Sequence, residues 1–202
     1  MLINTLHFYI TTITLKMIMD NFNGKFYVKI NVPINLADTE EEKSKMSNRY
    51  EEGLKIIKKS CYRKDNVIAL STIGIDSETP RPYVREVDAY YEDGVFYITT
   101  WAKSNKMKQI AQNKEVAFTA CRKGISGIGI GENLGWVLDP KNAEIRLKLR
   151  KAFAKWYDEA NKEENKNCVI LAIRITKCVI FRDHGAVRYH LDFVNKEEGT
   201  FS

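Results

Sequence analysis

A β-hairpin signal in the middle of the chain is the feature that most constrains the fold. Residues 83–91 alternate between two faces, Glu92-Asp93-Gly94 is a hairpin turn, and residues 95–100 (VFYITT) form the returning strand. An isolated hairpin is only marginally stable in water, because further strands are needed to bury one of its faces. The hairpin therefore predicts a larger antiparallel sheet.

Further strand signals flank the hairpin. Residues 125–138 (ISGIGIGENLGWVL) are rich in glycine but lack the Gly-Lys-Ser/Thr ending of a phosphate-binding loop. We interpret them as a bent strand with its glycines at crowded points. The other segments with strand patterns are residues 67–73, 115–121, 168–175, 178–181 and 186–194. Roughly six or seven antiparallel strands predict a mainly β fold, a small closed or split β-barrel, because closure removes exposed sheet edges.

Three segments outside the strands carry helix signals. In the first, Thr39 and Glu42 have the spacing of a capping box and precede an apolar face. The second, residues 103–113, is short. The third begins at Asp139-Pro140 and carries an apolar stripe of Leu149, Ala152, Phe153, Trp156, Tyr157 and Ala160. The barrel is therefore expected to contain inserted helices.

The chain is expected to hold one barrel domain, residues 46–202, preceded by an N-terminal extension, residues 1–45. Its 202 residues, 44% of them hydrophobic, are enough for one core. Residues 20–37 have an extended pattern, and residues 1–19 are too short and polar for a membrane span and lack the basic start of a signal peptide. The extension is either an arm docked on the barrel or the result of a mis-assigned start, with Met46 as the natural beginning.

Charge and cysteine usage favour a soluble cytoplasmic protein that binds neither nucleic acid nor membrane. The net charge is +6, but Lys and Arg are interleaved with 26 acidic residues and form no basic tail. The four cysteines are far apart, form no C-x-x-C pair and are expected to be buried or half-buried thiols. His184 and His190 have acidic neighbours but no convergent third ligand, so no metal site is predicted.

Polar residues gather where the hairpin ends and the short helix begins. Ser104 is a good N-cap, and the N–H groups and positive dipole at a helix start form an anion site. Lys106 can add charge-assisted hydrogen bonds, and Arg85 on the neighbouring strand can reach the same place. Each also has an ordinary structural role, since Arg85 could pair with Asp88 or Glu86. The junction as a whole comprises Thr99, Thr100, Lys103, Ser104, Asn105 and Lys106.

This window has the order Pro-x-x-Arg-x-Val, then an aromatic strand ending in Thr, then Ser-x-Lys. The residues in that order are Pro82, Arg85, Val87, Phe96, Tyr97, Thr100, Ser104, Lys106, Ile110 and Asn113. The pattern resembles the pyridoxamine 5′-phosphate oxidase-like family of split β-barrels, and the resemblance extends more weakly over roughly residues 50–180. It implies a split barrel that holds flavin mononucleotide (FMN) at the interface of a homodimer.

The resemblance also implies roles for the residues of the phosphate end. Arg85 and Lys106 would hold the FMN phosphate, and Ser104 and Thr100 would donate hydrogen bonds to it. Asn105 stands where the family has an arginine, so one phosphate charge is missing. The nearby cations that could compensate for it are Lys103 and Lys108.

At the ring end of the flavin, the backbone of Glu86 and Val87 would line the isoalloxazine. Thr99 and Asn133 complete the expected cofactor-binding set. Trp136 could stack on the flavin or, as the more ordinary role, pack in the core.

The activity implied by the resemblance is FMN-dependent redox chemistry on an unidentified small molecule or electron donor. The oxidase itself ends in a segment with a Trp and an Arg-rich motif, whereas this chain has no Trp after Trp156, so its vitamin substrate is not assigned. No catalytic side chain is predicted, since the flavin itself carries the electrons. A non-catalytic flavin-binding or sensor protein, or a barrel for a deazaflavin or haem, stays open as an alternative.

Overall fold

The computed structural model describes residues 14–19, 26–31, 36–74 and 79–199. The chain divides into two units, Met1–Lys45 and Met46–Ser202. The first unit contains an antiparallel pair of strands, β1 (Thr14–Met19) and β2 (Phe26–Asn31). The extended pattern predicted for residues 20–37 is confirmed over β2 and wrong at Leu36 and Ala37, which are helical. Its parts at 20–25 and 32–35, and residues 1–13 of the predicted arm, lie outside the described residues.

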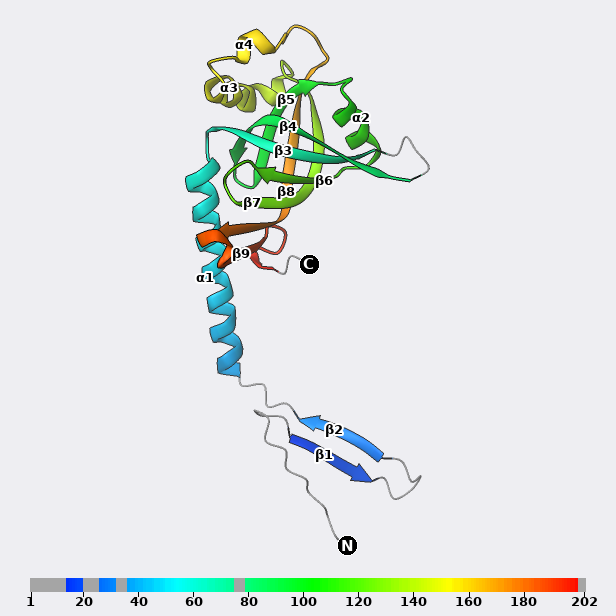
Figure 1. The fold of residues 1–202 in the computed structure, drawn as a ribbon, viewed down its shortest axis with the longest axis vertical. Helices are drawn as coiled ribbons and strands as arrows, with labels where there is room; N and C mark the ends of the chain where they lie inside the picture. Colours follow the sequence, from blue (N-terminus) through cyan, green and yellow to red (C-terminus); the bar gives the residue numbers. More distant parts are fainter. Residues whose placement is uncertain (1–13, 20–25, 32–35, 75–78, 200–202) are drawn as a thin grey trace. The chain divides into compact units, whose positions relative to one another are not determined.

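The second unit is built on a closed antiparallel barrel (Figure 1). Its strands are β3 (Asp65–Gly74), β4 (Arg81–Glu92), β5 (Val95–Trp101), β6 (Glu115–Ala120), β7 (Ile125–Trp136) and β8 (Cys168–Arg182), extended by β9 (Val187–Asp192) and β10 (Glu197–Glu198). Neighbours follow the order β10-β9-β8-β5-β4-β3-β6-β7, and β7 also pairs with β8, which closes the ring. The predicted mainly β fold with inserted helices, a split barrel, is confirmed.

Closure depends on the glycines of β7, which bring its backbone against β8. A Cβ on Gly127 would lie 2.6 Å from the carbonyl oxygen of Lys177, so no larger residue fits there. The β7–β8 register shifts between Ile128 and Gly129 and again between Asn133 and Gly135. These irregularities bend the strand, as predicted for residues 125–138.

The barrel interior is filled by every second residue of its strands. On β3, for example, Ile68, Leu70 and Thr72 are completely buried, whereas the residues between them are partly or fully exposed. Phe96 of β5 and Phe118 of β6 meet edge-to-face inside the barrel, with ring centroids 5.2 Å apart. The hairpin predicted from the sequence thus contributes directly to the core.

The helices differ from their predicted bounds. They are α1 (Leu36–Cys61), α2 (Asn105–Gln112), the 3-10 turn η1 (Pro140–Asn142), α3 (Ala143–Ala152) and α4 (Tyr157–Ala160). Helix α1 begins at Leu36, so Thr39 and Glu42 lie inside it and do not cap it. The prediction of a single third helix was wrong. Phe153 and Trp156 have non-helical backbone angles, and α3 and α4 are separate helices. None of the described helices has the length and apolar character needed to cross a membrane.

The predicted break between the strands 168–175 and 178–181 is also absent. Strand β8 runs without interruption from Cys168 to Arg182 because it pairs with β5, β7 and β9 along its length. The four cysteines are free, and all but the half-buried Cys121 are buried, as predicted. Burial raises the pKa of the Cys178 thiol to about 12, which keeps it protonated.

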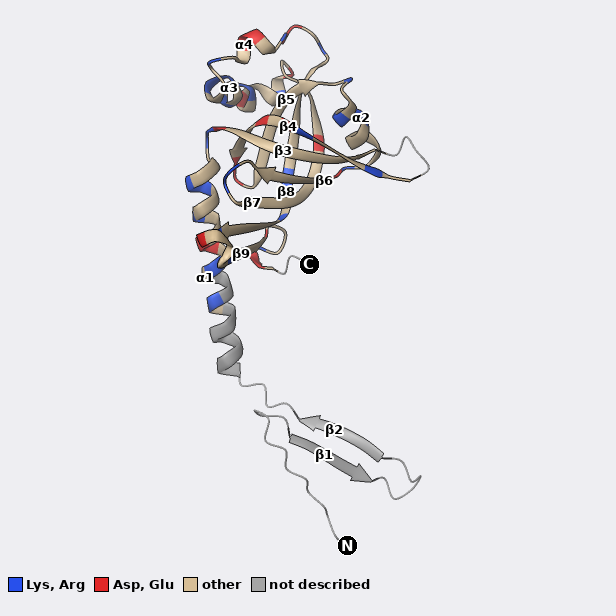
Figure 2. Cartoon of the chain, viewed as in Figure 1, with Lys and Arg blue, Asp and Glu red and all other residues tan. Residues whose placement is uncertain are grey.

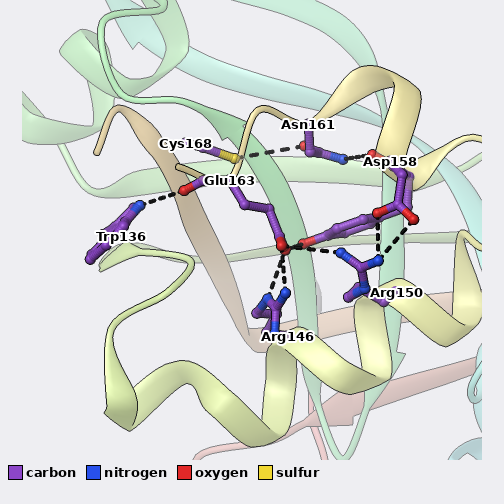
Figure 3. Close-up of polar contacts among 8 residues, drawn as sticks. Trp136, Arg146, Arg150, Asp158, Asn161, Glu163 and Cys168 are labelled. Carbon is purple, nitrogen blue, oxygen red and sulfur yellow. Dashed lines mark hydrogen bonds and ion pairs between the residues drawn. The ribbon is translucent and has the colours of Figure 1, made fainter. Parts of the chain in front are cut away.

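Helices α3 and α4 pack over the outside of the barrel and are held there by one buried carboxylate. Glu163 accepts hydrogen bonds from Arg146 at 2.8 and 2.5 Å, from Arg150 at 3.1 Å and from the Tyr157 hydroxyl at 3.0 Å (Figure 3). Its backbone carbonyl accepts a further bond from the indole of Trp136 at 2.7 Å. This network fixes the segment that follows α4, which forms one wall of the groove described next.

Candidate functional site

Strands β4 and β5 separate soon after their turn. They pair only at Tyr90–Tyr97, Tyr91–Phe96 and Glu92–Val95, whereas β4 pairs with β3 along almost its whole length. A groove of about 340 Å³ opens where they diverge. It is lined by Glu86, Val87, Asp88, Ile98, Thr99, Thr100, Trp101, Lys106, Trp156, Ala160, Asn161, Lys162 and Cys168.

The groove has a cationic end beside α2. Lys106, in the first turn of α2, lines the groove, and Arg85 lies behind it, bonded to Thr72 Oγ1 at 2.5 Å and to Gln109 Oε1 at 3.0 Å. Burial lowers the pKa of both groups, and the Arg85 charge lowers that of Lys106 further. Within the part of the chain that is described, neither cation has a carboxylate partner. Figure 2 shows the basic residues of α2 at this end of the barrel.

Ser104 adds an unsatisfied hydroxyl at the same end. It precedes α2 with extended backbone angles, as an N-cap does, but its side chain makes no capping hydrogen bond. Its Oγ is buried and has no hydrogen-bond partner among the described residues. Buried polar atoms are almost always paired, so an orphaned hydroxyl next to two unpaired cations indicates a place for an anion.

The structure brings together most of the predicted cofactor residues. Glu86, Val87, Thr99, Thr100 and Lys106 line the groove. Arg85 and Ser104 lie at its cationic end but not in its lining. Asn105 is exposed as the first residue of α2, and the structure does not place it in the groove.

Asn133 and Trp136 lie elsewhere. Asn133 lines a separate groove of about 430 Å³ between β7 and α3, and its Oδ1 accepts a bond from the Gly135 amide at 2.9 Å. Charged groups of that groove are already paired, as in Arg174 with Glu132 at 2.7 Å. Trp136 packs against the apolar cluster under α3, in the core role that the sequence favoured.

Several groove residues were missed by the sequence reasoning. Trp101, 45% exposed, directly follows the predicted Thr100 and could have been included. Trp156 and Lys162 come from the α3–α4 region, which long-range contacts bring to the groove: β5 pairs with β8, and the Trp156 indole bonds to Asp65. Lys162 is a further cation in the lining, whereas Lys103 and Lys108 do not line the groove.

The groove also has an acidic side. Burial, and then the charges of Asp65 and Glu86, raise the pKa of Asp88. Asp65 accepts a hydrogen bond from the Trp156 indole at 3.1 Å, which ties the α4 wall to β3. The lining of the groove thus contains acidic as well as basic side chains.

The thiol that lines the groove is protonated, and the side chains of the groove form no metal-binding cluster. Burial, followed by the charges of Glu163 and Glu164, raises the pKa of the Cys168 thiol to about 11, so it is not a thiolate at neutral pH. Among the described residues, no group of three or more His, Cys, Asp or Glu side chains could hold a metal ion. The arrangement can bind and orient a ligand.

Solved structures similar to this chain share its fold. A heme-binding protein from Mycobacterium smegmatis matches with a TM-score of 0.51 at 11% identity, over 66% of this chain and 55% of that one. A Clostridium acetobutylicum protein related to general stress protein 26, of the pyridoxinephosphate oxidase family, has a TM-score of 0.49 at 13% identity, over 74% and 98%. General stress protein 26 from Bacillus anthracis has a TM-score of 0.47 at 21% identity, over 62% and 91%.

These likenesses concern the fold, because all three identities are low. No protein-family model and no curated protein matches the sequence. The sequence pattern predicts the barrel of β3–β8, its β4–β5 hairpin and the helix α2 after that hairpin. The fold is a split β-barrel, and it resembles the folds of pyridoxamine 5′-phosphate oxidase-like structures.

Proposed function

We propose that the groove between β4 and β5 binds FMN and that the protein is an FMN-dependent oxidoreductase. The observation that carries the proposal is the cationic end: Lys106 and Arg85 without carboxylate partners, next to the orphaned Ser104 hydroxyl. A phosphate monoester carries about two negative charges and three acceptor oxygens. It would satisfy all three groups at once and would benefit from the N-terminal dipole of α2.

The rest of the groove suits a flat ring attached to that phosphate. Because β4 pairs with β5 at only three positions, the edge of β4 facing the groove has backbone N–H and C=O groups that no strand occupies. Such groups can bond the heteroatoms of an isoalloxazine, as expected for Glu86 and Val87. The exposed indole of Trp101 provides an apolar surface at the mouth.

The flavin would supply the redox chemistry, and this chain's residues would hold and orient it. Lys106 and Arg85 would anchor the phosphate, Thr99 and Thr100 would donate hydroxyl hydrogen bonds, and the α4 wall would exclude water from one side. No side chain is needed as an acid or base. The reacting partner is a small molecule or electron donor that can enter the open part of the groove.

We propose further that the protein is a homodimer whose two-fold interface lies beside this groove. Four paired residues form a row across the outside of the barrel, one each on β4, β3, β6 and β7: Val84, Ser71, Ala117 and Ile128. Val84 is 71% exposed and Ile128 39%, which is unusual for the middle of a sheet. Glu86 lies on the same face of β4 as Val84, so a second copy seated on this row would border the groove.

The absorption spectrum of the purified protein, with mass spectrometry of any molecule released on denaturation, tests the proposal. Bands near roughly 375 and 450 nm and a released mass of FMN are expected. Bleaching by a reduced nicotinamide and recovery in air would support turnover, whereas a flavin that no donor reduces would identify a binding or sensor protein. A colourless protein that does not bind added FMN, or one that releases haem or a deazaflavin, would overturn the assignment.

A further inference from the structure

Two turns on the opposite side of the barrel from the β4–β5 hairpin turn meet in a second, basic groove. The β6–β7 turn (residues 121–124) and the 3-10 turn η2 (Asp183–Gly185) are joined by a hydrogen bond from the Phe181 amide to the Gly124 carbonyl, 2.7 Å. The groove has a volume of about 500 Å³. It is lined by Arg122, Lys123, Gly124, Phe181, Arg182, Asp183, His184 and Gly185.

The arginines of this groove lack carboxylate partners. Elsewhere, five arginines pair with acids: Arg49, Arg63, Arg146, Arg150 and Arg174. Among the described residues, no ion pair forms at Arg122, Arg182 or Arg188, nor at Arg81 and Arg85 of β4. The first three of these arginines all lie on or next to the two turns, and Asp183 is the only acid in the lining. An excess of unpaired guanidinium groups around one groove favours an anionic ligand.

Two of the cations are held in place before any ligand arrives. Arg182 donates to the carbonyls of Lys123 at 2.9 Å and Phe181 at 2.8 Å. Lys123 donates to the carbonyl of Ser60 at 3.1 Å and to the side chain of Asn66. None of these acceptors carries a charge, so no acid neutralises either cation, and both side chains are ordered before a ligand binds.

An aromatic ring borders the same groove. Phe181 is 38% exposed, and the Arg188 guanidinium lies over its ring, 5.7 Å from the centroid. Arg122 and His184 are exposed at the rim, on backbone with positive φ of 59° and 54°. The groove therefore combines guanidinium groups, which match phosphate oxygens in pairs, with an aromatic surface on which a planar base can stack.

We propose that this groove binds the phosphate and base of a nucleotide, with the phosphate between Arg122, Lys123 and Arg182 and the base against Phe181. Its volume lies within the range of small-molecule sites. The site is separate from the proposed flavin groove and shares no lining residue with it. The nucleotide could be free or the end of a single strand, since both present the same groups.

Calorimetric titration of the full chain with AMP, and with a ten-nucleotide single-stranded oligonucleotide, tests this proposal. The Arg85→Ala/Lys106→Ala background removes binding at the flavin groove. Arg122→Asp should weaken AMP binding at least about tenfold, because it reverses a charge while keeping a residue that tolerates positive φ. Arg174→Gln, which removes a charge already paired with Glu132, is the matched control and should have little effect.

A second pair of measurements separates the ring from the phosphate. Phe181→Leu should weaken AMP severalfold but leave inorganic phosphate unchanged. An oligonucleotide that binds more tightly than AMP through Arg122 would identify a nucleic-acid strand as the source, and equal binding would identify a free nucleotide. No AMP or oligonucleotide binding at low salt, or equal losses in Arg122→Asp and Arg174→Gln, would overturn the proposal.

Discussion

Lys106 and Arg85 are like charges held side by side: burial first, and the Arg85 guanidinium second, lower the pKa of the Lys106 ammonium. Two partly buried cations without carboxylates repel each other and are held together only by the surrounding fold. A bound dianion would remove that repulsion. Ligand binding and the stability of this end of the barrel should therefore be coupled.

The double variant Arg85→Ala/Lys106→Ala should lose FMN and keep its fold. Each charged hydrogen bond to the phosphate is worth about 1.5–3 kcal/mol, so the dissociation constant should rise by at least two orders of magnitude. Flavin fluorescence measures the affinity and circular dichroism the fold. Lys103→Ala/Lys108→Ala removes the same charge from exposed positions and should bind FMN normally. Normal affinity in the first variant would place the phosphate elsewhere.

Ser104→Ala should weaken FMN binding and leave the stability of the ligand-free protein almost unchanged. Replacing an N-cap serine usually costs about 0.5–2 kcal/mol, but here the Ser104 hydroxyl makes no capping bond and has no partner among the described residues. The melting temperature without flavin should thus change little. FMN affinity should fall by about 0.5–1.5 kcal/mol. A large loss of stability without flavin, with affinity unchanged, would make Ser104 purely structural.

Acid should weaken the α3–α4 region through Glu163. The Arg146 guanidinium holds the pKa of this carboxyl below its usual range. A lowered folded-state pKa contributes stability that is complete above the unfolded value, about 4.3, and is lost as the pH falls through the folded value. The free energy of unfolding in urea should therefore decline below about pH 4.3.

Glu163→Gln should remove this decline and cost about 1–3 kcal/mol at neutral pH, since it leaves the guanidinium groups without their acceptor charge. Glu164→Gln, at the exposed neighbouring position, is the control and should keep the pH dependence of the natural protein. Equal acid sensitivity in the two variants would show that the decline arises elsewhere.

Gly127→Ala should destabilise the barrel by about 2 kcal/mol or more, because the added methyl group meets the Lys177 carbonyl 2.6 Å away in a backbone that cannot move aside. Ser126→Ala, one residue earlier on β7, should stay within about 0.5 kcal/mol. Chemical denaturation of both variants measures the difference. Similar stabilities would mean that β7 and β8 can separate at this point.

Val84→Lys/Ile128→Lys should convert the proposed dimer into monomers, because each lysine would be buried without a partner in the interface. Light scattering across a range of concentrations should show the dissociation constant rising by about tenfold or more. Leu147→Lys on α3, an equally exposed leucine, is the control. A natural protein that is already monomeric at high concentration would contradict the proposal.

The sequence predicted those parts of the fold that depend on local pattern. The hairpin, the bent glycine strand and the barrel follow from alternation, turn residues and the need to remove sheet edges. The start of α1 did not follow from the pattern, and neither did the break between α3 and α4. At that break Phe153 and Trp156 stack with ring centroids 4.7 Å apart, a tertiary contact that helical periodicity does not reveal. The local pattern predicted two strands in place of the long β8, which is continuous because it pairs with three neighbouring strands.

The site was predictable where its residues are close in sequence. Thr99, Thr100 and Lys106 lie within one strand end and one helix turn, so their shared location follows from local geometry. Lys162 lines the same groove because β5 pairs with β8 and the Glu163 network holds the segment that follows α4. Such proximity depends on long-range topology, which spacing along a single chain does not reveal.

The separation of β4 from β5 after three residue pairs affects how the sequences of such barrels can diverge. A ligand that hydrogen-bonds mainly to the backbone of β4 contacts few side chains along that edge. The residues there can therefore be substituted without loss of binding. Selection would then act on a few anchoring groups and on the glycines that let β7 approach its neighbour. Barrels of this design can therefore keep one architecture while their sequences become mutually unrecognisable.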